Sequence, residues 1–538
     1  MSKAHLDPVI PGHLLEIRAE DNPDKEVYLF EKGGQGEDIL TYADLYQKSN
    51  RFAAFLKSLG LGKGDTFGLF MRNHPEFVYA LMGGTFIGAI AVPIDPRSRG
   101  DKLAHYLNDS RAKLVITTGD LLPLLEAVRP QTPELKHTAV AWRPEIGIPP
   151  SGHYPALDEI LDKPIPTVDN AIFDVRHPME IIYTSGTTGT PKGVVIKMNR
   201  TGAILIMTRV VWKYKPSDVL YTGLSLTHGN AQAVTMFPAL ALGLKAVISP
   251  RFTKSRIWEI CRKYGCTTFS LLGGMMSGIY NEPPRENDGD NPVKMVISAG
   301  TPLVIWADFE KRFNLKILEW YGAVEGGFAY KPIDQGPIGS FGKTLPGVME
   351  LKVVDDEDRE LGPGQVGELL VRMVKGKTEV NYLGRPEESE AKTRGGWLRT
   401  GDMVHKDAQG WFFFDYRKGS ALRRAGDFIQ PDLVEKVVGE HPDVSDVCVY
   451  GIPAASGAPG ESDLVAAVTP FEGRTIDPAS IFAACVSGLE ANAVPSFLQV
   501  VEDIPKTISE KAMDRLLREA FDPQAPNVFR VEAYRNIS

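Results

Sequence analysis

The sequence contains few cysteines. Its 538 residues include only four, and no two of them form a C-x2-C pair: Cys261, Cys266, Cys448 and Cys485. The C-x4-C spacing of the first two fits no common metal-binding motif. Dispersed cysteines of this kind are typical of thiols in a reducing compartment, so the sequence predicts a cytoplasmic protein.

An excess of positive charge is also absent. The chain has 60 Lys and Arg against 68 Asp and Glu, and its net charge of −8 gives no overall attraction for nucleic acid or anionic lipid. The amino terminus, MSKAHLDPVIPGH, lacks the apolar core of a secretory signal. The carboxyl terminus, YRNIS, is neither a prenylation box nor a peroxisomal address. We therefore expect neither a nucleic-acid partner nor a targeting signal.

One charge-free run was weighed as a membrane span. Residues 77–94, FVYALMGGTFIGAIAVPI, extend for 18 residues without a charge, near the lower limit for crossing a bilayer. The run contains three Gly and one Pro, and its AIAVPI end is typical of a strand. These features favour a buried helix followed by a buried strand. We predict no membrane span and leave peripheral membrane contact open.

What the sequence does contain is an alternation of strand-like and helical segments. Helical spacing marks segments such as 42–60. Strand-like apolar runs lie between such segments at 66–71, 113–118, 180–185, 245–250 and 294–300. This alternation predicts an α/β fold with layered, largely parallel sheets.

The pattern changes twice towards the carboxyl terminus. After about residue 340, alternating apolar positions with Gly-Pro punctuation predict a turn-rich antiparallel β subdomain. Beyond 412–426 the pattern predicts a small α+β unit. Because 538 residues exceed a single core, we predict a large domain at 1–419 and a small one at 420–538.

The most unusual stretch is polar and flexible: residues 183–193, YTSGTTGTPKG. Glycines, hydroxyls and Lys192 after a predicted strand are typical of a phosphate site, where backbone N–H groups and a cation meet the anion. The Gly186-x-x-Gly189-x-x-Lys192 spacing does not fit a Walker A loop, since no Ser or Thr follows the lysine. No strand-linked GxGxxG indicates a Rossmann site either.

This stretch resembles the signature loop of the adenylate-forming superfamily, which includes acyl-CoA synthetases, luciferases and the adenylation domains of peptide synthetases. Five further motifs resemble those of the family and follow in family order: SAGTPL (298–303), YGAVEGG (321–327), GWLRTGD (396–402), YRKGSALRRAGDFIQP (416–431) and PKTISEK (505–511). The chain is therefore identified as a member. Residues 252–266 and 441–470 further resemble carnitine/crotonobetaine-CoA ligases and fatty-acid-transport-type acyl-CoA synthetases.

The resemblance implies a two-step reaction that uses ATP, Mg²⁺ and CoA. A carboxylate attacks the α-phosphorus of ATP, pyrophosphate leaves, and a thiol then displaces AMP from the acyl adenylate. Such transfer depends on positioning and on charge neutralisation. The implied partners are therefore a small carboxylic acid, ATP and CoA, and a homodimer is left open.

The resemblance also assigns residues. Lys192 and the loop hold the β- and γ-phosphates, and Glu325 ligates Mg²⁺ with Thr184, since this cation prefers oxygen donors. Asp402 accepts the ribose hydroxyls beside Arg417, while Lys511 bridges the carboxylate and the α-phosphate. The other implied contacts to ATP or AMP are Ser185, Gly186, Thr187, Thr188 and Gly189 in the loop, and Gly300, Thr301, Tyr321 and Gly322 around adenine.

In the family, the segment that corresponds to residues 270–280, SLLGGMMSGIY, lines the acyl pocket. Gly273 and Gly274 would leave space, Met275 and Met276 would be adaptable fillers, and Gly322 would border the pocket. This segment carries no charge, which favours a bulky apolar acid (fatty, alicyclic, steroid-like or polycyclic aromatic) over carnitine. Plain core packing of the two methionines stays equally open.

Three further residues are assigned by the same resemblance. His228 lies at the pocket mouth, where it gates or orients the carboxylate. Ser420 is the hinge about which the mobile small domain rotates, and Gly426 lines the CoA tunnel, where glycine lets the backbone approach a ligand closely.

Four positions depart from the family pattern. Val324 replaces a threonine and cannot donate a hydrogen bond worth about 1 kcal/mol. Ser420 stands where Asp or Lys is common, Glu510 replaces a glycine, and Asp514 stands where Arg is common. None of them removes a group essential to the chemistry.

The acceptor of the acyl group is the last open choice. Amino-acid activators that use a carrier protein usually place an Asp near the His228 region, and residues 224–234 contain no acid. CoA is therefore the favoured acceptor. Transfer to a carrier protein, luciferase chemistry and a carnitine/crotonobetaine-type ligase remain as alternatives.

Overall fold

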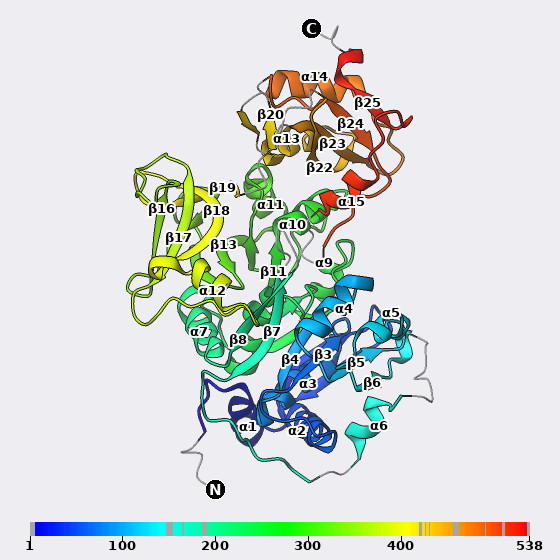
Figure 1. Cartoon of the computed structure of the whole chain (residues 1–538), viewed down its shortest axis with the longest axis vertical. Helices are drawn as coiled ribbons and strands as arrows, with labels where there is room; N and C mark the ends of the chain where they lie inside the picture. The colour runs from blue at the N-terminus through cyan, green and yellow to red at the C-terminus, as the bar shows by residue number, and fades with distance from the viewer. Residues whose placement is uncertain are drawn as a thin grey trace. The chain divides into compact units, whose positions relative to one another are not determined.

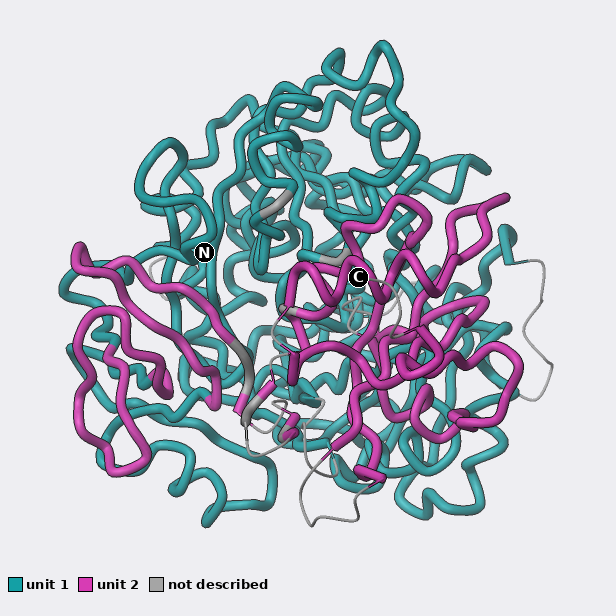
Figure 2. The backbone as a smooth tube through the Cα atoms, turned by 90° about the horizontal axis from the view of Figure 1, so that it is seen from above, with its two compact units in different colours: residues 1–351, 370–400 teal, residues 352–369, 401–538 magenta. Residues whose placement is uncertain are grey.

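The chain forms two compact units. The computed structural model describes residues 6–146, 154–163, 166–184, 191–418, 422–424, 427–429, 431–455, 462–489, 491–507 and 512–534. The first unit comprises Met1–Leu351 and Leu370–Thr400, and the second comprises Lys352–Leu369 and Gly401–Ser538 (Figure 2). The predicted boundary between residues 419 and 420 falls outside the described residues and stays a prediction.

The first unit begins with a six-stranded sheet in the order β6-β5-β3-β4-β7-β8. All neighbours in it are parallel except β7 and β8, which form an antiparallel hairpin. The strands are β3 (Thr66–Phe70), β4 (Ile90–Ile94), β5 (Leu114–Thr118), β6 (His137–Ala141), β7 (Pro178–Thr184) and β8 (Lys192–Lys197). Buried parallel strands read as continuous apolar runs, which is why the sequence revealed them.

Six helices accompany this sheet: α1 (Pro11–Asp21), α2 (Tyr42–Ser58), α3 (Pro75–Ile87), α4 (Gly100–Asp109), α5 (Leu122–Val128) and α6 (Leu157–Asp162). Helix α2 begins with a capping box, because the Asp44 backbone N–H donates to Thr41 Oγ1 and the Thr41 N–H donates to the Asp44 carboxylate. Helices α1, α2 and α3 pack side by side (Figure 1).

The charge-free run is a buried helix and a buried strand, as predicted. Every residue of α3 is buried, the helix ends at Gly88 with a φ of 75°, and the chain then enters β4. A Cβ on Gly83 would lie 2.5 Å from the Ser49 carbonyl oxygen, so a glycine is required where α3 meets α2. Among the described residues, no helix has both the length and the apolar character that a membrane span needs.

A second sheet of the first unit has eight strands in the order β14-β13-β12-β11-β9-β10-β1-β2. The pairs β1–β2 and β13–β14 are antiparallel, and the other neighbours are parallel. The strands are β1 (Glu26–Glu31), β2 (Glu37–Thr41), β9 (Val219–Thr222), β10 (Lys245–Ile248), β11 (Thr268–Leu272), β12 (Met295–Ala299), β13 (Lys316–Ala323) and β14 (Gly326–Lys331). Parallel β12 and β13 bring residues 299–301 and 319–323 to the same sheet edge.

The helices associated with the second sheet are α7 (Arg200–Met207), α8 (Phe237–Leu242), α9 (Ile257–Tyr264), α10 (Gly273–Tyr280) and α11 (Trp306–Phe313), with π-helical turns at Thr208–Trp212 and Ala231–Met236. Asn73, which follows β3, joins the two sheets. Its amide donates to the carbonyls of Leu224 and Ser249 and accepts from the Leu226 N–H.

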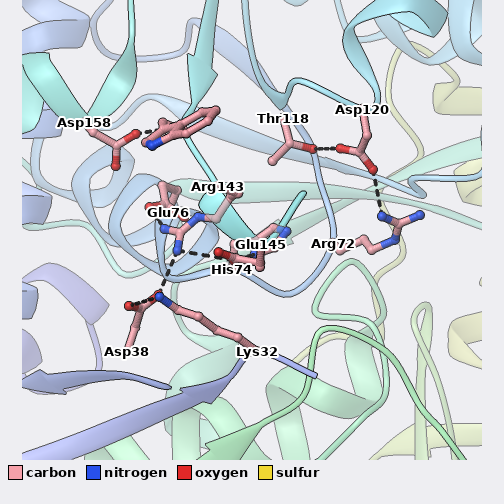
Figure 3. Close-up of polar contacts among 11 residues, drawn as sticks. Lys32, Asp38, Arg72, His74, Glu76, Thr118, Asp120, Arg143, Glu145 and Asp158 are labelled. Carbon is pink, nitrogen blue, oxygen red and sulfur yellow. Dashed lines mark hydrogen bonds and ion pairs between the residues drawn. The ribbon is translucent and has the colours of Figure 1, made fainter. Parts of the chain in front are cut away.

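A buried charge cluster joins the same two sheets (Figure 3). Arg143, just beyond β6, donates to Asp38 on β2 over 2.7 Å and to Glu76 on α3. Lys32 pairs with Asp38 over 2.6 Å, and Arg143 lies 3.9 Å from Glu145. Arg143 is 7% exposed and Glu76 only 2%, so opposite charges compensate one another away from water.

The turn-rich region forms the predicted β subdomain. Its strands are β15 (Ser340–Gly342), β16 (Met349–Val354), β17 (Gly367–Met373), β18 (Leu398–Lys406) and β19 (Phe412–Arg417), with helix α12 at Pro386–Lys392. β18 and β19 are antiparallel. The division between the two units falls within β16, β17 and β18 rather than in a linker.

The carboxyl-terminal part of the second unit is the predicted α+β domain, drawn in orange and red in Figure 1. A four-stranded sheet, β22-β23-β24-β25, packs Leu464 and Leu498 against the apolar side chains of Val434 and Phe482. The elements of this domain are β20 (Leu422–Arg424), β21 (Asp427–Ile429), α13 (Pro431–Gly439), β22 (Val444–Pro453), β23 (Ser462–Pro470), α14 (Pro478–Gly488), β24 (Phe497–Val500), α15 (Asp514–Glu519) and β25 (Val528–Arg530).

Candidate active site

The β7–β8 hairpin supplies the first part of the candidate site. Thr184 lies opposite Lys192 across the hairpin. A Cβ on Gly193 would lie 2.7 Å from Ile181 Cγ2, so the residue after Lys192 has to be a glycine. The predicted phosphate-binding residues Ser185, Gly186, Thr187, Thr188 and Gly189 lie outside the described residues.

Lys192 contacts a segment that the sequence analysis did not single out. The segment runs beside β8, because the Val195 N–H donates to the Asn381 carbonyl and the Leu383 N–H donates to the Gly193 carbonyl. Lys192 Nζ pairs with Glu388 and lies 5.3 Å from the centroid of the Tyr382 ring. Such a cation over an aromatic face is favourable.

Tyr382 also contacts the predicted magnesium ligand. Its hydroxyl donates to Glu325 Oε1 over 3.3 Å. One aromatic side chain therefore links Lys192, from the glycine-rich hairpin, to Glu325, from the YGAVEGG motif. The structure thus brings together two residues that lie far apart in the sequence and that the resemblance assigned to one site.

Arg200, the first residue of α7, is the next neighbour of this group. Its Nη1 donates to the Val324 carbonyl over 3.0 Å, and its charge acts on both Glu325 and Glu180. Burial lowers the pKa of Arg200 and raises the pKa of Glu180 to about 7. Arg200, Val324 and Glu325 border a cavity of about 290 Å³.

The SAGTPL motif, predicted to lie beside adenine, is held by a buried carboxylate. Glu319 of β13 accepts hydrogen bonds from the Gly300 N–H over 2.6 Å and from the Thr301 hydroxyl over 2.5 Å. Burial raises the pKa of Glu319 to about 7, against the lowering effect of these donors. Two residues further along β13, the Tyr321 ring packs against Phe341 with centroids 4.8 Å apart. The sequence analysis named Gly300, Thr301 and Tyr321 but not Glu319.

At Gly322 and Gly273 the backbone packs closely against neighbouring atoms, so that a side chain would not fit. A Cβ on Gly322 would lie 2.7 Å from the Trp320 ring, and one on Gly273 would lie 2.0 Å from the Gly300 carbonyl oxygen. The space that a side chain of residue 273 would fill is therefore occupied by the loop at Gly300 and is not empty. Met275 and Met276, further along α10, are buried.

His228 lies in a turn beside Arg200. Its Nδ1 accepts from the Asn230 N–H over 3.4 Å, and burial lowers its pKa, so the imidazole is neutral at pH 7. A Cβ on the next residue, Gly229, would lie 3.7 Å from Arg200 Nη2 and 4.0 Å from Val324 Cγ2. The turn thus lies next to the YGAVEGG motif, and the predicted role of His228 at the pocket mouth stays a prediction.

The second unit holds the predicted ribose-binding pair. Asp402 on β18 is buried and lies opposite Arg417 on β19. Gly401, before it, has a φ of 78°, and its N–H donates to Glu368 over 3.1 Å. Of Arg417 only the backbone is described. Ser420, Gly426, Glu510 and Lys511 lie outside the described residues, so their predicted roles stay predictions.

Comparisons with known proteins concern the family and the fold. Residues 15–375 match the family described as AMP-binding enzyme, and residues 433–511 match the AMP-binding enzyme C-terminal domain. The chain belongs to the AMP-binding enzyme family. The predicted superfamily is therefore confirmed.

Two curated relatives of this AMP-binding enzyme correspond to the two subgroups that the sequence resembled. A crotonobetaine/carnitine–CoA ligase of Salmonella typhimurium is 28% identical over 503 residues, which cover 92% of this chain and 96% of the relative. Long-chain fatty acid transport protein 6 of Mus musculus is 28% identical over 520 residues, covering 90% and 82%.

Solved structures confirm the fold of the AMP-binding enzyme. An anthranilate-CoA ligase in complex with anthranoyl-AMP superposes with a TM-score of 0.82 at 23% identity, covering 97% of this chain and 99% of that one. A Mycobacterium tuberculosis fatty acyl CoA synthetase gives a TM-score of 0.69 at 23% identity, covering 96% and 99%. The predicted α/β class, with its small α+β domain, is therefore correct.

Proposed function

We propose that the protein is an AMP-forming acid–CoA ligase. It activates a carboxylic acid as the acyl adenylate, with release of pyrophosphate, and then forms the CoA thioester. The observation that carries the proposal is the link from Lys192 through Tyr382 to Glu325. The proposal is supported because a cation suited to polyphosphate and a carboxylate suited to a metal both contact Tyr382, beside the loop that resembles the family's phosphate-binding loop.

In the first half-reaction the chain's residues bind and orient the nucleotide. Lys192 and the loop at 184–189 neutralise the β- and γ-phosphates, so that pyrophosphate can leave. Gly300, Thr301, Tyr321 and Gly322 hold adenine, and Asp402 with Arg417 holds the ribose. Lys511 stabilises the charge that develops between the acid and the α-phosphate.

Magnesium fits the donors available beside Lys192. Glu325 is a partly exposed carboxylate and Thr184 offers a hydroxyl, and hard divalent cations prefer such oxygen donors. These two residues would hold Mg²⁺, which when bound would neutralise phosphate charge. Tyr382 keeps the Glu325 carboxylate oriented through its hydroxyl.

In the second half-reaction the small domain rotates about Ser420, and Gly426 lines the tunnel through which the CoA thiol reaches the adenylate. Substrate chemistry is proposed from the segment 270–280. It contains no charged side chain, so the acid is a bulky apolar one: fatty, alicyclic, steroid-like or polycyclic aromatic. His228 orients its carboxylate.

A two-stage assay tests this function. Purified protein is incubated with ATP, Mg²⁺ and a panel of long-chain, alicyclic, steroidal, polycyclic aromatic and short quaternary-ammonium acids, and acyl-AMP is detected by mass spectrometry. CoA is then added. We expect an apolar acid to give acyl-AMP and then acyl-CoA.

Each other outcome of the assay has a defined meaning. An adenylate that persists after CoA is added would reject the ligase and support transfer to a carrier protein. Preference for the quaternary-ammonium acid would reject the proposed substrate class only.

A further inference from the structure

The carboxylate of Glu319 has a local environment unlike that of the ion-paired acids in the first unit. Its hydrogen-bond partners are neutral donors of one loop: the Gly300 N–H, the Thr301 N–H, which lies 3.3 Å from both oxygens, and the Thr301 hydroxyl. Two backbone N–H groups can only donate, so they need acceptors on the side chain that they meet. A carboxylate supplies acceptors on both oxygens.

One charged group that acts on this carboxylate, Lys331, lies on its own sheet. Glu319 lies opposite Lys331 across the β13–β14 pair, and that lysine favours the ionised carboxylate from a distance. Lys331 Nζ lies 5.0 Å from the Trp306 ring centroid, and Glu310, Asp334 and Lys316 act in turn on Lys331. The Ser298 hydroxyl lies 2.7 Å from the Thr301 hydroxyl and donates to it, because the one Thr301 proton goes to Glu319, and this contact closes the network on β12.

The loop that Glu319 holds is fixed from the other side as well. Gly300 has a φ of 78°, a conformation that side chains rarely adopt, and its carbonyl oxygen lies where a Cβ of Gly273 would be. The loop therefore sits between Glu319 and the first residue of α10. Because Glu319 precedes Tyr321 by two residues, one strand carries both this anchor and an aromatic residue assigned to adenine.

We propose that Glu319 is a positioning residue for nucleotide binding, which holds Gly300 and Thr301 in the conformation that receives adenine without itself touching the nucleotide. The inference rests on the proposed function, because it takes the loop at 298–303 as the adenine side of the site. It adds a residue outside the motifs that the resemblance supplied.

The pH dependence of ATP affinity follows from the same contacts. Protonation of Glu319 removes the negative charge that strengthens its hydrogen bonds to the loop, and it adds a proton that the loop N–H groups cannot accept. Its pKa of about 7 places this change near neutral pH. ATP should therefore bind more weakly as the pH falls from 8 to 6.

The test compares wild type with the full-length variant Glu319→Gln. We expect the Kd for ATP, measured by calorimetry, and the KM for ATP to rise about tenfold, since hydrogen bonds to a charged group are lost. The KM for the acid and for CoA should change less than twofold. Between pH 8 and 6 the Kd for ATP should rise more for wild type than for the variant, because only wild type protonates Glu319.

Two controls separate positioning from folding. Glu310→Gln removes a carboxylate that accepts from the Ile317 N–H over 2.8 Å at the far end of β13, and it should leave ATP affinity unchanged. Glu319→Asp keeps the charge but shortens the side chain, so it should weaken ATP affinity at pH 8 because the carboxylate no longer reaches the Gly300 and Thr301 N–H groups. It also replaces Glu319→Gln if that variant does not fold.

An unchanged Kd for ATP in folded Glu319→Gln, or a fall in kcat alone, would overturn the proposal. Calorimetry with ATP needs no acid, so the test stands even if no acid in the panel is activated. If wild type bound ATP but activated no acid, the proposed function would fail and Glu319 could still be judged. If wild type bound no ATP, both would fail.

Discussion

The Arg143 cluster and the Glu319 loop are two buried polar regions of the same unit that are stabilised in different ways. In the first, carboxylates meet cations, as Arg143 does Asp38 and Glu76. In the second, a carboxylate meets the neutral donors of Gly300 and Thr301. Paired charges fix one sheet against another, whereas the Glu319 carboxylate keeps a pKa near neutral and serves a loop.

The comparison indicates that burying the ionised Glu319 carboxylate lowers the stability of the fold near neutral pH. The same carboxylate serves nucleotide binding. Its folded pKa of about 7 exceeds the ordinary value of 4.5, so its stabilising contribution is complete below about pH 4.5 and is lost as the pH rises through 7. The affinity for ATP should instead increase as the pH rises. A group retained at such a disadvantage is typical of a functional site.

The largest expected effect is on the rate of the reaction. Lys511→Ala should reduce adenylate formation at least a thousandfold, because it removes the cation that stabilises charge at the α-phosphate. Thioester formation from supplied acyl-AMP and CoA should continue at nearly the wild-type rate. Both half-reactions are measured by mass detection, and equal loss of both would reject the role given to Lys511.

Arg143→Met should give the largest effect on stability. Removing Arg143 leaves the buried Glu76 without its cation, while Asp38 keeps Lys32, and costs roughly 3–5 kcal/mol of the free energy of unfolding in denaturant titrations. Arg72→Met is the matched control: its pair with Asp120 is 42% exposed on the arginine side, so less than about 1 kcal/mol should be lost. Similar losses in the two variants would contradict the structural role of the cluster.

Acid should destabilise the charge cluster through His74. Burial and the nearby Arg143, Arg72 and Lys32 lower the pKa of His74 to about 3, well below the ordinary 6.5. Its stabilising contribution is present above pH 6.5 and falls by roughly 2 kcal/mol at pH 5, since the unfolded state then takes up the proton.

Chemical unfolding at pH 7.5 and pH 5 checks this effect. The variant His74→Gln should lose less stability than wild type over that interval. Equal losses in both proteins would exclude His74 as the source. Glu319 changes stability in the opposite direction over the same interval, so Glu319→Gln is measured alongside.

The smallest effect is expected at the link between the two predicted phosphate-site residues. Tyr382→Phe keeps the ring beneath Lys192 and removes only the hydroxyl that donates to Glu325. A hydrogen bond to a carboxylate, worth about 1.5 kcal/mol, corresponds to roughly a tenfold loss of kcat/KM for ATP. A loss above a hundredfold, measured by pyrophosphate release, would mean that the hydroxyl has a further role.

Much of the fold was predictable from the sequence, and the reason is local. The predicted strands at 66–71 and 113–118 correspond to β3 (Thr66–Phe70) and β5 (Leu114–Thr118). Buried parallel strands are continuous apolar runs whose limits lie in the neighbouring residues. The motif loops were found in the same way, since their glycines and hydroxyls are adjacent in the chain.

The residues that the sequence analysis missed depend on pairing between distant segments. Tyr382 reaches Lys192 and Glu325 only because residues 381–383 run along β8. Glu319 reaches Gly300 only because β12 and β13 are parallel with Ser298 opposite Glu319. A lone Tyr or Glu carries no such information. The segment 270–280 gives an example within a predicted site. The sequence predicts that Gly273 leaves space in the pocket, and the structure shows that a side chain there would overlap the Gly300 carbonyl oxygen.

Acid-dependent exchange of labelled pyrophosphate into ATP tests the central claim most directly, that this chain activates a carboxylic acid at the loop carrying Lys192. We predict exchange for wild type with at least one acid of the panel, no exchange without acid, and a loss of at least a hundredfold in folded Lys192→Met. Exchange that survives in Lys192→Met, or that no acid stimulates in the wild-type enzyme, would contradict the account.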